Sequence, residues 1–216
     1  MSRKKRQLNT RVQRPVYIIM CEGMTEEQYI EFIRASLPEE RISILTERPG
    51  SNQKTLFEEA KRRVKQCTNK ERVWILCDVD DGGAYLKSVG AGSPLERSVK
   101  WAISNPAIAA WLLMHVNAPT RYEHRDKFAS MAKKEGLLAG RHAKELVSTA
   151  LHSKSGDAKT AAVRLRRAHH AASCIFPDDN PSSTVDLLLE AIVKDYNAHP
   201  IGKPDPNTDL TVESLY

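Results

Sequence analysis

The sequence lacks the features that mark membrane and secreted proteins. No apolar run approaches the roughly 20 residues that a bilayer-spanning helix needs. The first residues are polar and basic, without the apolar core of a secretory signal. The cysteines have no CxxC or other metal-ligand spacing; they are Cys21, Cys67, Cys77 and Cys174. We therefore expect a cytoplasmic protein with reduced cysteines and no membrane partner.

The chain carries an excess of positive charge. Its 216 residues have a formal net charge of +6, which favours a polyanionic partner such as nucleic acid. Much of the excess lies near the N-terminus, at Arg3, Lys4, Lys5, Arg6, Arg11 and Arg14. This segment could bind a phosphate backbone or only aid solubility, and charge alone does not choose between the two. We predict a basic disordered tail at 1–14, one domain at 15–199 and a loose tail at 200–216.

Strand and helix patterns alternate through the first half of the chain. The apolar runs at 16–21 and 73–77 are typical of strands that are buried on both faces of a parallel sheet. Shorter strands are expected at 42–46 and 101–104, and amphipathic helices at about 26–37 and 55–66. Thr25 could cap the first of these helices. The pattern predicts an α/β fold with a mostly parallel sheet flanked by helices.

The second half is expected to be mostly helical. Helices are predicted at 107–115, 158–172 and 185–196, with a charged helical insert at about 120–155. The helix at 158–172 carries Arg164, Arg166 and Arg167, which makes it the best internal candidate for a nucleic-acid contact. A solvated surface is the commoner explanation of such a basic face.

Acidic residues follow two of the predicted strands. Asp78, Asp80 and Asp81 come directly after the run at 73–77, and Glu22 follows the run at 16–21. Because the carboxyl ends of parallel strands meet at one edge of a sheet, these side chains are expected to lie close together. Carboxylates that converge repel one another unless a cation or a proton separates them. Oxygen ligands of this kind suit Mg²⁺ or Mn²⁺.

Such a site could carry out metal-assisted cleavage of a phosphodiester bond. Glu22 could act there as a metal ligand or as a general acid or base. The alternative for Asp78 to Asp81 is a strand followed by an ordinary Asp-Gly turn, since Asp and Gly favour turns.

Two segments are similar to the Toprim fold of topoisomerases, primases and nucleases. They are IIMCEG at 18–23 and LCDVD at 76–80. Three further segments resemble the RloB-like proteins: EGMTE at 22–26, SNPAIAAWLLMH at 104–115 and NPSS at 180–183. The resemblance covers roughly residues 15–196. Its signature residues are Gly23, Thr25, Glu26, Asn105, Pro106, Trp111 and His115.

The resemblance implies a Toprim-like domain associated with restriction and phage defence. The implied activity is metal-dependent cleavage of nucleic acid, with Glu22, Asp78 and Asp80 as the acidic site. It also implies an AAA/ABC-type ATPase encoded nearby as a partner. One departure matters: the family's glutamate in the 104–115 segment aligns with Ala109 here, so the chain could be a weakened member unless Asp81 or Glu26 substitutes.

The sequence therefore leaves two functions open. One is a Mg²⁺-dependent nuclease, and the other is a nucleic-acid-binding subunit that works with an ATPase. Strand passage and primase chemistry are disfavoured, because 216 residues leave no room for the additional domains. A phosphotransferase with an aspartate nucleophile is a more distant alternative, based on Asp78 and Asp80 alone.

Overall fold

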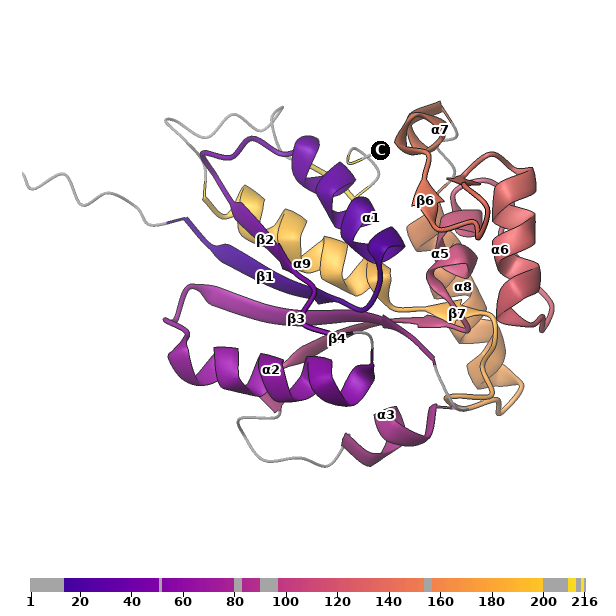
Figure 1. Cartoon of the computed structure of the whole chain (residues 1–216), viewed down its shortest axis with the longest axis horizontal. Coiled ribbons are helices and arrows are strands. Elements are labelled where there is room, and N and C mark those ends of the chain that lie inside the picture. Colours follow the sequence, from indigo (N-terminus) through magenta and orange to yellow (C-terminus); the bar gives the residue numbers. More distant parts are fainter. Residues whose placement is uncertain are drawn as a thin grey trace, which may run out of the picture.

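A mostly parallel sheet of five strands organises the chain (Figure 1). The computed structural model describes residues 14–50, 52–79, 83–89, 97–153, 157–199, 210–212 and 215. The strands are β1 (Val16–Cys21), β2 (Ser43–Glu47), β3 (Glu71–Asp78), β4 (Lys100–Asn105) and β7 (Ser182–Ser183). Their order is β2-β1-β3-β4-β7, and only β7 runs antiparallel to its neighbour. The predicted α/β class is confirmed.

Alternation along β1 divides the core into two layers. Tyr17, Ile19 and Cys21 pack on the face covered by α1 (Met24–Ala35) and α9 (Val185–Asn197). Ile18 and Met20 pack on the opposite face, which α2 (Gln53–Gln66) and α3 (Ala84–Val89) cover (Figure 1). Strands buried on both sides are continuously apolar, which explains why the sequence identified them.

Asp78 ends β3 on the first of these faces. Trp74 and Leu76, two and four residues earlier, belong to the core beneath α1 and α9. Because side chains alternate, Asp78 points to the same side, towards α1 and not towards α2. The carboxylate is therefore directed at the N-terminal end of α1.

The helical C-terminal half is confirmed as well. It contains α5 (Ile108–Met114), α6 (Arg125–Lys134), α7 (Ser148–Ser153), α8 (Ala158–Ala171) and α9. In Figure 1, α6, α7 and the hairpin between them lie on the right, beside the carboxyl end of the sheet.

The insert at about 120–155 is less helical than predicted. A hairpin of β5 (Leu138–Ala139) and β6 (Glu145–Leu146) separates α6 from α7. Gly136 and Gly140 have φ angles of 74° and 78°, a left-handed conformation that ends the helix and opens the turn. Strands of two residues are too short to show an alternating pattern in the sequence.

Two local predictions need correction. Thr25 does not cap α1: the N-cap is Gly23, and the Thr25 hydroxyl donates a hydrogen bond to the Lys144 carbonyl at 2.8 Å. The strand β7 was not predicted, because its two serines resemble the start of a helix.

Some predictions fall outside the described residues. These are the tail at 1–13, including Arg3, Lys4, Lys5 and Arg6, most of the segment 200–216, and both Asp80 and Asp81. Within the described ranges, no helix is both long and apolar enough to cross a bilayer.

Candidate active site

A cavity of about 390 Å³ lies at the carboxyl end of the sheet. Its walls come from the turn after β1, the start of α1, the end of β3, the start of α5 and the insert. The charged or titratable residues that line it include Glu22, Glu26, Asp78, Arg125, His142 and Lys144. Ligands of open α/β sheets bind at this edge, so the location agrees with the sequence argument.

Asp78 is the most constrained acid of the cavity. Its Oδ1 accepts a hydrogen bond of 2.7 Å from the backbone N–H of Ile108, the first residue of α5. Its Oδ2 lies 3.3 Å from Nη2 of Arg125. Its backbone carbonyl accepts a 2.7 Å hydrogen bond from Nε2 of Gln53. Asp78 thus joins β3 to α2, α5 and α6 through one buried residue.

Glu22 lies beside Asp78, although 56 positions separate them along the chain. Oε2 of Glu22 accepts a 3.0 Å hydrogen bond from the backbone N–H of Asp78. The contact exists because β1 and β3 are parallel neighbours, with Cys21 opposite Leu76. The structure therefore brings together two of the predicted acids.

Glu26 is a third acid at this point, supplied by the first turn of α1. It is buried, and its carboxyl group makes a hydrogen bond with that of Asp78. A Cβ atom on Gly23 would lie 2.7 Å from Oε2 of Glu26, so the glycine leaves room for this carboxylate. From the sequence, Glu26 is expected only as a signature residue or as a substitute for the glutamate missing at Ala109. Its place in the first turn after Glu22 is the signal that points to the site.

The proximity of the acids affects the protonation of the two buried ones. Burial raises the pKa of Asp78 well above its usual range, and the negative charges of Glu26 and Glu22 raise it further, whereas Arg125 opposes the rise. Burial also raises the pKa of Glu26. Negative charges on both Asp78 and Glu26 are therefore unfavourable, and a shared proton or a bound cation would relieve their repulsion.

A complete metal-ligand set is not present in the described part of the chain. Among those residues, no group of three His, Cys, Asp or Glu side chains is arranged to hold a metal ion. Asp80 and Asp81, which were predicted to contribute, lie outside the described residues.

Comparison with known families identifies the chain. A family model described as "RloB-like protein" matches residues 17–192. The chain belongs to the RloB-like family. Searches of curated proteins and of solved structures found no match.

The RloB-like signature residues of α5 lie mainly in the core. Trp111 and His115 are buried and pack against the ring of Tyr29 from α1. Neither lines the cavity. Burial lowers the pKa of His115 to about 3, so the imidazole is neutral in the fold. Their position indicates that they join α5 to α1.

Asn105 and Pro106 connect the site to the C-terminal loop. Nδ2 of Asn105 donates hydrogen bonds to the Pro177 carbonyl at 2.8 Å and to Oδ1 of Asp179 at 2.7 Å. Oδ2 of Asp179 accepts a 2.9 Å hydrogen bond from the Ser182 hydroxyl, at the start of β7. Two signature segments distant in sequence, 104–115 and 180–183, thus contact each other at the edge of the sheet.

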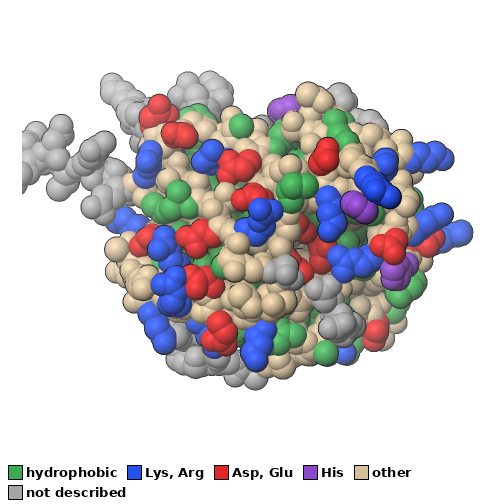
Figure 2. Space-filling view, viewed as in Figure 1, with side chains coloured by type: hydrophobic (Ala, Val, Ile, Leu, Met, Phe, Trp, Pro, Cys, Tyr) green, Lys and Arg blue, Asp and Glu red, His purple; other side chains and the backbone are tan. Residues whose placement is uncertain are grey.

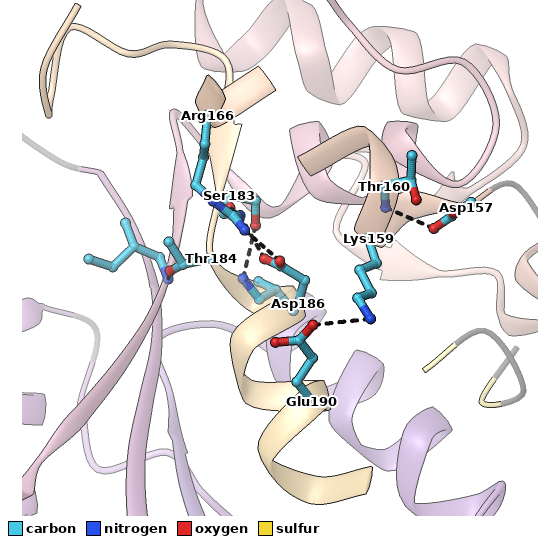
Figure 3. Close-up of polar contacts among 10 residues, drawn as sticks. Asp157, Lys159, Thr160, Arg166, Ser183, Thr184, Asp186 and Glu190 are labelled. Atoms are coloured by element: carbon cyan, nitrogen blue, oxygen red, sulfur yellow. Dashed lines mark hydrogen bonds and ion pairs between the residues drawn. The ribbon is translucent and has the colours of Figure 1, made fainter. Parts of the chain in front are cut away.

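The three arginines of α8 have different environments. Arg166 donates bidentate hydrogen bonds to Asp186 of α9, at 2.7 Å and 2.6 Å, and a further one to the Ser183 carbonyl (Figure 3). Arg164 and Arg167 are exposed. The nucleic-acid contact stays a prediction for all three: Arg164 and Arg167 are free of the Asp186 contact, whereas Arg166 also links α8 to β7 and α9.

We expect Arg166→Ala to destabilise the protein strongly. Asp186 is 0% exposed, and removing the partner of a buried carboxylate costs about 3–5 kcal/mol. Arg167→Ala is the matched control, because the neighbouring side chain is exposed and its loss should change stability by less than about 0.5 kcal/mol. Urea unfolding of both variants measures the difference, and equal stabilities would contradict a structural role for Arg166.

His115 should make the fold sensitive to acid. Its pKa is about 3 in the fold and about 6.5 in the unfolded chain, so the unfolded state binds more protons between these values and stability falls as the pH falls. Between pH 7 and pH 5 the wild type should lose about 2 kcal/mol more than His115→Gln. Urea unfolding at several pH values measures this slope, and parallel curves would show that His115 does not titrate in this way.

Proposed function

We propose that this RloB-like chain is a metal-dependent nuclease that cleaves phosphodiester bonds of nucleic acid in phage defence. The observation that carries the proposal is the meeting of Glu22, Glu26 and Asp78 at one cavity. Two of these carboxylates, Glu26 and Asp78, are buried, and Glu22 beside them is half-buried. Gathering negative charge in this way is costly, so the convergence supports a function that uses it.

The donor set suits a hard divalent cation. Mg²⁺ is commonly held by one or two carboxylates, with water and substrate phosphates as its other ligands. Glu26 and Asp78 would be the first ligands, with Glu22 beside them and Asp80 or Asp81 as further candidates. A bound Mg²⁺ or Mn²⁺ would supply an acidified water and charge screening for the phosphate.

The chain's own residues would orient the reaction. The backbone N–H of Ile108 and the guanidinium of Arg125 hold the Asp78 carboxylate in place. Glu22 fixes the end of β3 through the Asp78 amide and would act either as a further metal ligand or as the base that accepts a proton from an attacking water. Arg125 could leave Asp78 for the substrate phosphate once a cation neutralises that carboxylate.

A second candidate function is a weakened, nucleic-acid-binding subunit that works with an AAA/ABC-type ATPase. Ala109 supports it, because this residue lines the cavity and is 2% exposed, at the position where the family resemblance expects a glutamate. Such a subunit would co-purify with an ATPase from its native cells and would cleave nothing by itself.

Removing either strand-end acid should abolish cleavage. We expect Glu22→Gln and Asp78→Asn to lower the rate at least about 100-fold, because the loss of groups that support a metal commonly costs 10–100-fold and direct ligands cost more. Cleavage of tRNA, plasmid and single-stranded DNA with Mg²⁺ or Mn²⁺ is the measurement.

The matched control is Glu58→Gln, the same change on the exposed surface of α2. It should retain the wild-type rate, and thermal unfolding establishes that all variants are folded. Full cleavage activity in both acid variants would show that Glu22 and Asp78 are not catalytic.

Ala109→Glu separates the two candidate functions. If Glu26 already supplies the carboxylate, the added glutamate should not increase cleavage, and without metal it should lower the melting temperature, because it adds a buried like charge. Rates and melting curves with and without Mg²⁺ are the measurement. A tenfold or greater gain in rate would favour the weakened subunit.

A further inference from the structure

We propose that the cavity has a phosphate-binding half, formed by Arg125 and by the loop 140–144 between β5 and β6. This half would hold one phosphate of a single nucleic-acid strand against the acids. The inference rests on the proposed nuclease function for the role of the acids, but its own evidence comes from the insert.

The insert is tied to the helix that carries Glu26. The Thr25 hydroxyl donates a hydrogen bond to the Lys144 carbonyl at 2.8 Å, and the Leu146 N–H donates one of 2.7 Å to Oε1 of Gln28. Both contacts bridge more than 100 positions of sequence. They explain the signature threonine, since Thr25 fixes the loop relative to the first turn of α1.

The loop itself has an uncommon backbone. Gly140 has a φ of 78° and Ala143 has a φ of 49°. A left-handed alanine costs roughly 1–2 kcal/mol, so the fold keeps Ala143 in this conformation at some expense. Ala143 lines the cavity and directly precedes Lys144. Strain at this place is consistent with a loop that positions a functional side chain.

Acidic and basic side chains line the same cavity. Glu22, Glu26 and Asp78 come from the strand ends and from α1, while Arg125 and Lys144 come from the insert. Figure 2 shows Lys, Arg and His side chains gathered on the right, over α6 and the hairpin. Arg125 lies 3.3 Å from Asp78, and Lys144 is close enough for its charge to act on Glu26.

This arrangement suits a phosphate ester better than it suits a cation alone. The acids would repel a phosphate, so a strand can approach them only where other groups supply positive charge. Arg binds phosphate through its planar fork, and Lys binds it as a point charge. Both line the cavity together with the acids.

The size of the cavity points to a single strand. Its volume of about 390 Å³ is near the lower end of the roughly 300–1,000 Å³ typical of small-ligand sites. A space of this size is filled by about one nucleotide unit, and an unpaired nucleotide can enter it without a second strand.

The experiment measures how binding depends on salt. A fluorescent single-stranded octamer with cleavage-resistant phosphorothioate linkages is titrated into the full chain in Mg²⁺ buffer at several KCl concentrations. For Lys144→Gln we expect about three- to tenfold weaker binding, and a log–log salt slope that is shallower by about 0.7, the value for one lost phosphate contact. Arg125→Gln should weaken binding and reduce the salt slope by similar amounts. Arg125→Lys, which keeps the charge, should recover part of the affinity.

The control is Lys134→Gln, an exposed lysine of α6 that does not line the cavity. It should keep the wild-type slope. Equal slopes in Lys144→Gln and the wild type, or an equal loss in Lys134→Gln, would overturn the proposal. Because Arg125 also contacts Asp78, thermal unfolding checks that variant, while exposed Lys144 tests the idea without this complication.

Competitors identify the ligand. The unlabelled octamer should displace the probe at much lower concentration than inorganic phosphate or a pre-formed duplex of the same sequence. Displacement by inorganic phosphate or by duplex at equal concentration would overturn the assignment to a single strand.

This test can fail separately from the nuclease proposal. If Lys144→Gln weakens binding as expected while Glu22→Gln cleaves at the full rate, the phosphate-binding half is supported and the catalytic role of the acids is refuted. If the acid variants lose cleavage while Lys144→Gln keeps the wild-type salt slope, the catalytic role of the acids is supported and the phosphate-binding half is refuted.

Discussion

The buried carboxylate of Asp78 is the group on which the arrangement of the site depends. The Ile108 amide, the Arg125 guanidinium and the Glu26 carboxyl group interact with this carboxylate. Glu22 accepts a hydrogen bond from the backbone amide of the same residue. Each partner belongs to a different element of the fold. Burying one charge therefore specifies the relative positions of β1, β3, α1, α5 and α6, because any displacement would leave a polar group unsatisfied in a low-dielectric interior.

The family signature has two distinct roles in this structure. One part of the signature shapes the cavity directly. Gly23 leaves room for the Glu26 carboxylate, Thr25 anchors the insert, and Glu26 supplies an acid. Trp111 and His115 instead lie in the core between α5 and α1. A signature of this kind combines residues that act at the site with residues that hold its walls, and only their surroundings distinguish them.

The C-terminal elements close the edge of the sheet. Asn105 and Ser182 both donate hydrogen bonds to the carboxylate of Asp179. Arg166 binds Asp186 and the Ser183 carbonyl of β7 (Figure 3). These contacts keep α8 against β7 and α9 against β4, and β4 in turn pairs with β3 next to Asp78. Positive charge on α8 thus divides into Arg166, which is half-buried and paired with Asp186, and the exposed Arg164 and Arg167.

Much of the fold was evident in the sequence by itself. The apolar runs at 16–21 and 73–77 predicted the central parallel strands, because a strand covered on both faces must be continuously apolar. Parallel pairing then brought Glu22 and Asp78 to one edge. What only the tertiary structure decided was the facing wall: the hairpin of the insert, the left-handed Ala143, and the approach of Arg125 and Lys144 to the acids. Those contacts join residues 47 to 119 positions apart, and they depend on how the insert packs against α1 and α5, which no local pattern of side chains encodes.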